Sequence, residues 1–188
     1  IHDETQLVMD IGGGSVEFII GNDNEIFWKQ SFEIGAQRLL DKFHKKDPMP
    51  PASVDEVFNW LNIELKDLKK AIKKHQPKGL IGCSGTFDTL VEIYFKETGE
   101  DRPVHPKVFE LPIKAYRDIH RELLLKDKQA RLLIPGMVSM RVDMIVVASC
   151  LISFVTDLIP TEYITACTYA LKEGVLYSME HKPIAEKQ

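Results

Sequence analysis

The stretch LVMDIGGGSVEFIIGNDNEI, residues 7–26, places three consecutive glycines between two apolar runs and ends in a turn. Residues 7–11 have the apolar character of a buried strand, and residues 16–20 alternate between two faces. Residues 21–24 are typical of a tight hairpin turn, because glycine and asparagine tolerate left-handed backbone conformations. With a return strand over residues 25–33, this stretch predicts a three-stranded meander.

The three glycines, Gly12, Gly13 and Gly14, indicate a point where another molecule or segment approaches the backbone closely, because glycine weakens strands. A dinucleotide-binding fingerprint needs a third spaced glycine and a following helix, but Glu17 stands at that position and a strand pattern follows. A Walker loop needs a lysine that this stretch lacks. The pattern therefore favours a phosphate cradle of backbone N–H groups, with Ser15 as a hydroxyl donor, over a purely structural hairpin.

The acid before the glycines, Asp10, would repel a phosphate unless a divalent cation lies between them. We therefore expect Asp10 to bind Mg²⁺, or another divalent cation, although an acid at a strand end also caps turns. Glu17 either holds the same cation, or its water, or is an ordinary exposed strand residue.

A second small-residue loop follows a short strand at residues 80–81. Gly82, Ser84, Gly85 and Thr86 precede a helix, whose unpaired N–H groups suit a phosphate or a nucleotide. Tight packing of the strand–helix connection is the structural alternative.

The remaining chain alternates between helical and strand patterns, which predicts a single α/β layered domain over residues 1–188. A capping-box pattern at Ser53 and Glu56 predicts the start of the second helix. Helices are predicted over residues 35–44, 53–72, 87–97, 113–125, 128–133, 143–158 and 171–179, and further strands over residues 108–111 and 163–167.

Composition narrows the classes of partner. The formal net charge of −4 disfavours nucleic-acid binding, and no apolar run is long enough for a membrane-spanning helix. Lys66, Lys69, Lys70 and Lys73 form a stripe on the second helix, which we interpret as a solvated face and not as a track for a polyanion. Three scattered cysteines favour reduced thiols and a cytoplasmic protein.

Three motifs, DIGGGSVE, GCSGTFDTL and IPGMVSMRVDMI, together resemble the second domain of the exopolyphosphatase/guanosine pentaphosphate phosphatase (Ppx/GppA) family. The resemblance implies a ribonuclease H-like fold of the actin, hexokinase and Hsp70 superfamily. It also implies roles for residues that match the family's motifs. These are Asp10 and Gly12 to Ser15 in a phosphate loop, Glu17 as the acid after it, Gly82, Ser84, Gly85 and Thr86 in the adenosine motif, and Arg141 with Asp143 in an Arg-x-Asp element. The structural alternative is that Arg141 and Asp143 only cap and pair at the start of the helix over residues 143–158.

The resemblance extends through TACTYALKEGVLYSM, although Ala170 and Lys172 stand where the family often has glycine and arginine. It implies a Mg²⁺-assisted hydrolase that releases terminal phosphate from polyphosphate or guanosine pentaphosphate. The catalytic glutamate would belong to a preceding domain outside this chain, with Glu17 as the one candidate base within it. We therefore expect a fragment of a two-domain protein that is inactive alone; a homodimer is compatible with this reading. A guanine-alarmone sensor without turnover and an actin-like assembly ATPase are the alternatives.

Overall fold

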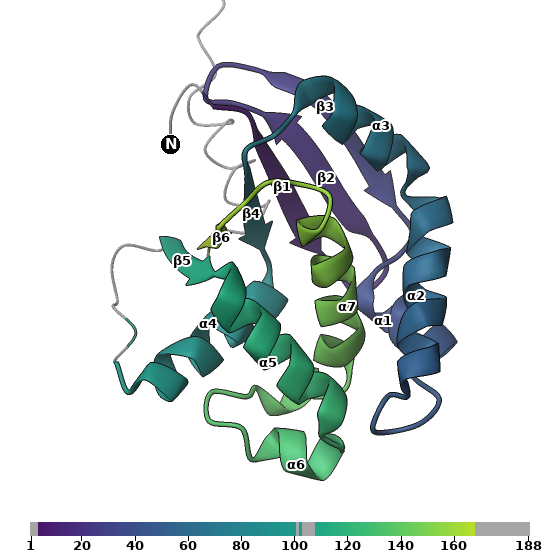
Figure 1. Cartoon of the computed structure of the whole chain (residues 1–188), viewed down its shortest axis with the longest axis vertical. Helices are drawn as coiled ribbons and strands as arrows, with labels where there is room; N and C mark the ends of the chain where they lie inside the picture. The colour runs from purple at the N-terminus through teal and green to yellow at the C-terminus, as the bar shows by residue number, and fades with distance from the viewer. Residues whose placement is uncertain (1–3, 101, 103–107, 168–188) are drawn as a thin grey trace, which may run out of the picture.

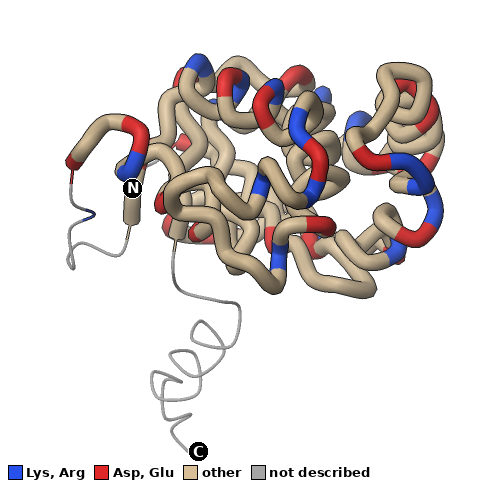
Figure 2. The backbone as a smooth tube through the Cα atoms, turned by 90° about the horizontal axis from the view of Figure 1, so that it is seen from below, with Lys and Arg blue, Asp and Glu red and all other residues tan. Residues whose placement is uncertain are grey.

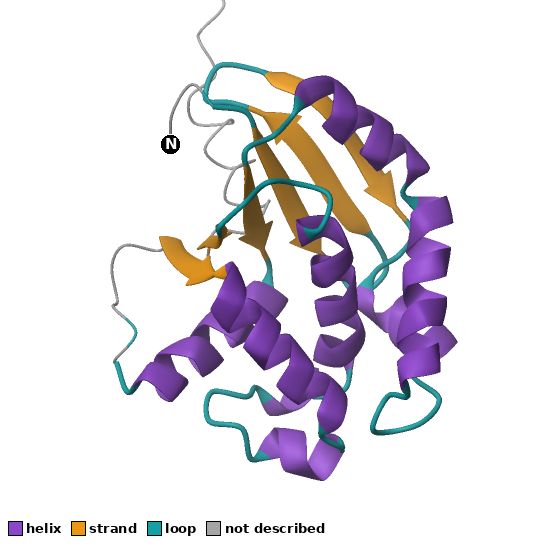
Figure 3. Ribbon diagram, viewed as in Figure 1, coloured by secondary structure: helices purple, strands orange, loops and turns teal. Residues whose placement is uncertain are grey.

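The computed structural model describes residues 4–100, 102 and 108–167 as an α/β fold with a six-stranded sheet (Figures 1 and 3). The described strands are β1 (Gln6–Ile11), β2 (Val16–Gly21), β3 (Ile26–Phe32), β4 (Gly79–Cys83), β5 (Val108–Pro112) and β6 (Tyr163–Cys167). The described α-helices are α1 (Ala36–Phe43), α2 (Pro51–Glu64), α3 (Lys66–His75), α4 (Gly85–Thr98), α5 (Ile113–Leu125), α6 (Lys128–Leu132) and α7 (Met144–Thr156), with a 3₁₀ turn, η1, at Ser139–Arg141.

The sheet has the order β3-β2-β1-β4-β6-β5. Its first three strands form the predicted antiparallel meander, while β4 and β6 run parallel to β1, and β5 is an antiparallel edge strand. The hairpin between β2 and β3 turns at Asn22, whose side-chain oxygen accepts hydrogen bonds from the amides of Asn24 and Glu25. The turn chemistry of the sequence therefore predicted the connection correctly.

One face of the sheet carries the hydrophobic core. Leu7, Met9 and Ile11 on β1 are buried, and their register partners on β2 are the buried side chains of Ile20, Phe18 and Val16. Helix α7 lies between α2 and α5 (Figure 1), and nearly all of its side chains are buried. It is the central helix of the core, as its apolar sequence predicted.

The second helix differs from the prediction. It begins at Pro51 with Pro50 as the N-cap, and Ser53 makes no capping hydrogen bond, because proline suits the first helical position without a side-chain cap. The helical pattern is also interrupted at Leu65, which separates α2 from α3. This break lets α2 pack on α7 while α3 packs on β2 and β3.

The lysine stripe lies on the outer side of α3, where Lys66, Lys70 and Lys73 are exposed and Lys69 is half-buried. Acidic and basic residues are interspersed over the helices in Figure 2. Among the described helices, none combines the length and apolar character needed to cross a membrane. The helix predicted at residues 171–179, with Ala170 and Lys172, lies outside the described residues.

Candidate functional site

The glycine loop between β1 and β2 is fixed by the start of α1. The carbonyl oxygens of Gly12, Gly13 and Gly14 accept hydrogen bonds from the backbone amides of residues 36, 37 and 35, at 2.9, 3.0 and 3.2 Å. Arg38 of α1 adds a hydrogen bond of 2.8 Å from its Nε atom to the Gly14 carbonyl. The first amides of α1 are therefore occupied by the loop and are unavailable to a ligand.

These hydrogen bonds orient the opposite side of the loop. In a planar trans peptide the carbonyl and the following N–H point in opposite directions. The N–H groups of Gly13, Gly14 and Ser15 thus point away from α1, and none of them donates a backbone hydrogen bond to another described residue. Gly13 and Gly14 are exposed, so the loop presents consecutive amide donors to an anion.

Close packing explains why position 35 is a glycine, but it does not explain the glycines at positions 13 and 14. A Cβ atom on Gly35 would lie 2.4 Å from the carbonyl oxygen of Gly13, so α1 can approach the loop only through a glycine. A Cβ atom on Gly13 or Gly14 would meet no described atom within 4 Å, and neither residue has a positive φ. The space beside these two glycines is free to receive a ligand.

A cavity of about 200 Å³ brings the two loops together. It is lined by Gly12 and Gly13 of the first loop, Gly85 and Thr86 of the second loop, and Arg141 before α7. Its other lining residues are Ile11, Ala36, Met144 and Ile145. Five of the residues predicted from the sequence therefore meet in one pocket.

Arg141 provides the positive charge of this pocket. Its guanidinium packs so closely on the second loop that a Cβ atom on Gly85 would lie 1.7 Å from Nη2. Within the described part of the chain, no hydrogen bond or ion pair involves the Arg141 side chain. Gly85 and Thr86 also belong to the first turn of α4, where N–H groups and the helix dipole favour an anion.

The second loop has an unusual backbone. Ser84, the N-cap of α4, has a φ of 100° and a ψ of 167°, a region that non-glycine residues rarely adopt. Its hydroxyl is buried, does not cap the helix and has no hydrogen-bond partner among the residues described. Gly82 is needed for packing, because a Cβ there would lie 2.2 Å from the Phe87 ring.

A row of polar side chains crosses the other face of the sheet at the same strand ends. Glu17 of β2 is the register partner of Asp10 on β1, and Asp10 is the register partner of Cys83 on β4. Glu17 accepts hydrogen bonds from the Ser15 hydroxyl at 2.6 Å and from the Ser31 hydroxyl at 2.7 Å. The hydroxyl hydrogen of Ser15 is thus directed to Glu17 and not to the pocket.

The adjacent carboxylates fit the chemistry of a magnesium site. Like charges directly opposite on neighbouring strands repel, and a cation between them would relieve that repulsion. No cluster of three or more His, Cys, Asp or Glu side chains suited to a metal occurs among the described residues. Mg²⁺ commonly binds one or two carboxylates and takes its other ligands from water and phosphate, so Asp10 with Glu17 matches that requirement.

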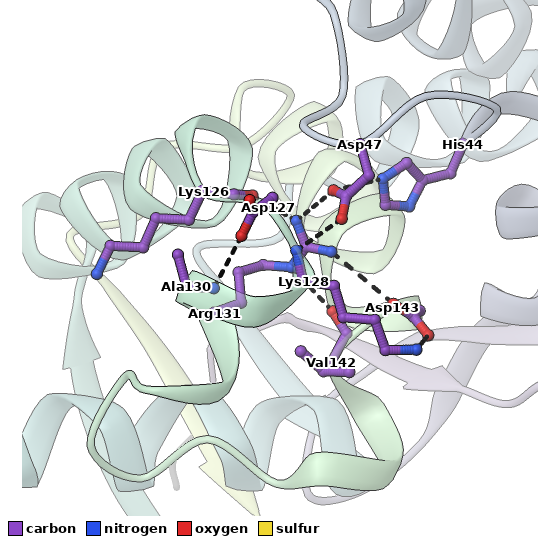
Figure 4. Close-up of polar contacts among 9 residues, drawn as sticks. All are labelled: His44, Asp47, Lys126, Asp127, Lys128, Ala130, Arg131, Val142 and Asp143. Carbon is purple, nitrogen blue, oxygen red and sulfur yellow. Dashed lines mark hydrogen bonds and ion pairs between the residues drawn. The ribbon is translucent and has the colours of Figure 1, made fainter.

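Asp143 lies in a different environment from Arg141. Its carboxylate is 2.5 Å from Lys128 Nζ and 3.9 Å from Arg131 Nη2 (Figure 4). The buried Arg131 also contacts Asp47 at 2.7 Å and donates from Nε to the Val142 carbonyl at 3.1 Å. Asp143 therefore belongs to an ionic network that anchors the segment just after Arg141.

Sequence reasoning missed several residues that shape the site. The sequence places Gly35 as the first residue of a helix over residues 35–44, whereas it is the N-cap of α1, a position where glycine is also common. No sequence signal distinguishes Arg131 or Asp47 from surface charges, because they meet across 84 positions of the chain. Their role depends on tertiary packing.

Comparison with known proteins gives a consistent family. A model of the Ppx/GppA phosphatase family matches residues 1–183. The structure of an exopolyphosphatase from Cytophaga hutchinsonii superposes with a TM-score of 0.90 and 48% identity, over 95% of this chain and 58% of that one. The Aquifex aeolicus PPX-GPPA enzyme shares the fold, with a TM-score of 0.80 and 24% identity, over 94% of this chain and 57% of that one.

A guanosine-5'-triphosphate,3'-diphosphate pyrophosphatase from Pseudoalteromonas translucida is 25% identical over 177 residues, which cover 93% of this chain and 34% of that protein. The chain therefore spans between about a third and three fifths of the length of these relatives.

Proposed function

The chain belongs to the Ppx/GppA phosphatase family, and we propose that it forms the phosphate-holding wall of a phosphoanhydride hydrolase. The substrate class is inorganic polyphosphate or guanosine pentaphosphate, from which terminal phosphate is released. The observation that carries the proposal is the pocket in which Arg141, Gly13 and the start of α4 meet. We also assign the domain to the ribonuclease H-like class, which the β3-β2-β1-β4-β6 strand order supports.

In this proposal the chain's own residues bind and orient the phosphate. The amides of Gly13 to Ser15 and the Arg141 guanidinium neutralise the non-bridging oxygens, on which charge is spread in the transition state. Phosphoryl transfer depends mainly on positioning and electrostatic stabilisation, so donors held rigidly by α1 suit the reaction.

Asp10, with Glu17 beside it, would hold Mg²⁺. A bound Mg²⁺ would neutralise charge on the phosphate oxygens. Ser15 and Ser31 fix one oxygen of Glu17 through their hydroxyls, which keeps this carboxylate oriented across the strand pair from Asp10.

The residue that activates the attacking water belongs to the remainder of the protein in this proposal. Glu17 is the alternative base within the chain, but its Oε1 already accepts two hydroxyl hydrogen bonds. The chain's coverage of 58% of the Cytophaga hutchinsonii exopolyphosphatase supports a cleft completed by further sequence.

The experiment is phosphate release by the full-length protein across a Mg²⁺ titration. Asp10→Ala should reduce Mg²⁺-dependent turnover at least tenfold while the unfolding transition changes little. Asp23→Ala, an exposed acid in the β2–β3 turn, is the matched control and should retain wild-type activity. Superimposable Asp10→Ala and wild-type curves would reject the magnesium role.

Binding measurements on the full-length protein distinguish the hydrolase from the two alternatives, a guanine-alarmone sensor and an assembly ATPase. Tight binding of guanosine pentaphosphate without any phosphate release would favour the sensor. Preferential binding of ATP together with polymerisation detected by light scattering would favour the assembly ATPase.

A further inference from the structure

Two of the three cysteines lie side by side at the end of the sheet. Cys83 is the last residue of β4, Cys167 is the last residue of β6, and the two are register partners in the parallel pairing. Neighbouring strands lie about 4.8 Å apart, and register partners project to the same face. Disulfides form when the two Cα atoms are about 4.4–6.8 Å apart, so the backbone geometry admits a bond between these cysteines.

The two thiols also differ in their environment. Cys83 is buried and Cys167 is partly exposed. Because a peroxide reaches the sulfur from solvent, the partly exposed Cys167 reacts first, and the buried Cys83 beside it is the resolving thiol.

We propose that Cys83 and Cys167 form a redox-active dithiol that a peroxide converts reversibly into a disulfide. The Cys167 thiolate attacks hydrogen peroxide, breaks the O–O bond and becomes a sulfenic acid, while the released hydroxide takes a proton. The Cys83 sulfur then displaces the hydroxyl from the Cys167 sulfur, and the thiol proton leaves with it as water. Overall, two thiols and one peroxide give one disulfide and two waters.

A disulfide between Cys83 and Cys167 would constrain the second loop. Cys83 immediately precedes Ser84, whose φ of 100° marks the start of the loop that reaches Gly85 and Thr86 in the pocket. The disulfide would join β4 to β6 beside Asp10, the neighbour of Cys83 on β1. This inference goes beyond the proposed hydrolysis and does not depend on it.

Cys150 is the internal control. It is buried in α7, and burial raises the pKa of its thiol to about 12, so it should neither react with peroxide nor pair. Cys150→Ser should therefore form the same disulfide as the wild-type chain.

The test is thiol titration and intact mass of the denatured protein after exposure to hydrogen peroxide and quenching. We expect the wild-type chain to fall from three thiols to one, to lose the mass of two hydrogens, and to yield a peptide that links Cys83 to Cys167. Dithiothreitol should restore all three thiols. Cys150→Ser should fall from two thiols to none, whereas Cys83→Ala and Cys167→Ser should form no intramolecular disulfide.

Three persisting thiols, a linkage to Cys150, or a gain of oxygen mass without a disulfide would each overturn the proposal. Circular dichroism of every variant before oxidation checks its fold. If Cys83→Ala does not fold, the wild-type peptide map together with Cys167→Ser still decides the question.

Discussion

Replacing Asp47 by Asn removes the main partner of a fully buried arginine. Arg131 Nη1 lies 2.7 Å from Asp47 Oδ1, and the backbone amide of Lys128 donates to Asp47 Oδ2 at 2.6 Å. The Arg131 side chain is inaccessible to solvent, so the substitution leaves a buried charge with weaker compensation.

The expected loss of stability is about 2–3 kcal/mol. Breaking a fully buried ion pair costs about 3–5 kcal/mol, but here three features reduce that value. The Asp47 side chain is 31% exposed, Arg131 keeps hydrogen bonds to the carbonyls of Val142 and Lys126, and Asp143 lies 3.9 Å away. For a domain of this size, the melting temperature should fall by about 4–12 °C.

The loss of stability is measured by urea unfolding. The wild-type chain is compared with Asp47→Asn and with Asp55→Asn, a control at an exposed acid. Burial raises the pKa of Asp47, but the hydrogen bonds from Arg131 and the Lys128 amide outweigh it and hold the pKa below its usual value. The stability gained from this carboxylate is therefore present above pH 3.8 and lost as the pH falls through the lower folded-state pKa. The difference between wild type and Asp47→Asn should shrink in acid. Equal stability of Asp47→Asn and Asp55→Asn at pH 7 would show that the Asp47 carboxylate does not stabilise the buried Arg131.

Three further predictions concern stability, binding and turnover. Burial lowers the pKa of His120 to about 4, so this residue takes up a proton more readily in the unfolded chain. The free energy of unfolding should therefore fall by up to about 3 kcal/mol as the pH falls from 6.5 to 4. In urea titrations, His120→Gln should flatten this pH dependence. Replacing Lys69, Lys70 and Lys73 by Gln should change polyphosphate affinity less than threefold in calorimetry, because these side chains lie on a solvated face; a loss of tenfold or more would identify them as a binding track. The 188-residue chain alone should release no phosphate above background with Mg²⁺, whereas turnover that disappears in Glu17→Gln would make Glu17 the base.

Local signals predicted much of the fold. The meander follows from alternating apolar residues and the Asn22 turn, and the apolar run before Thr156 predicted a buried central helix. The predicted start of α2 at Ser53 was wrong, because proline at the first turn outweighed the capping-box pattern. The break at Leu65 was missed because the apolar spacing continues through it while the two helices pack on different partners.

The sequence motifs named candidate site residues but not their arrangement in space. The glycine loops and Arg141 meet in one pocket, which no local pattern indicated, whereas the side chain of Asp143 joins Lys128 and Arg131. The pairing of Asp10 with Glu17, and of Cys83 with Cys167, depends on strand register. Register between β4 and β6 joins segments far apart in sequence, so no local pattern reveals it.

Calorimetry of tripolyphosphate binding to this chain in the presence of Mg²⁺ measures whether the glycine loop and Arg141 hold phosphate. Gly13→Val should abolish binding, because its side chain would fill the open space beside the loop amides. Arg141→Gln should weaken binding about 10- to 100-fold, as expected for losing a charged hydrogen bond of about 1.5–3 kcal/mol. Arg117→Gln, which removes an exposed arginine paired with Asp157, should leave the affinity unchanged. Equal affinities for wild type, Gly13→Val and Arg141→Gln, with all three chains folded, would show that neither the loop nor Arg141 holds phosphate.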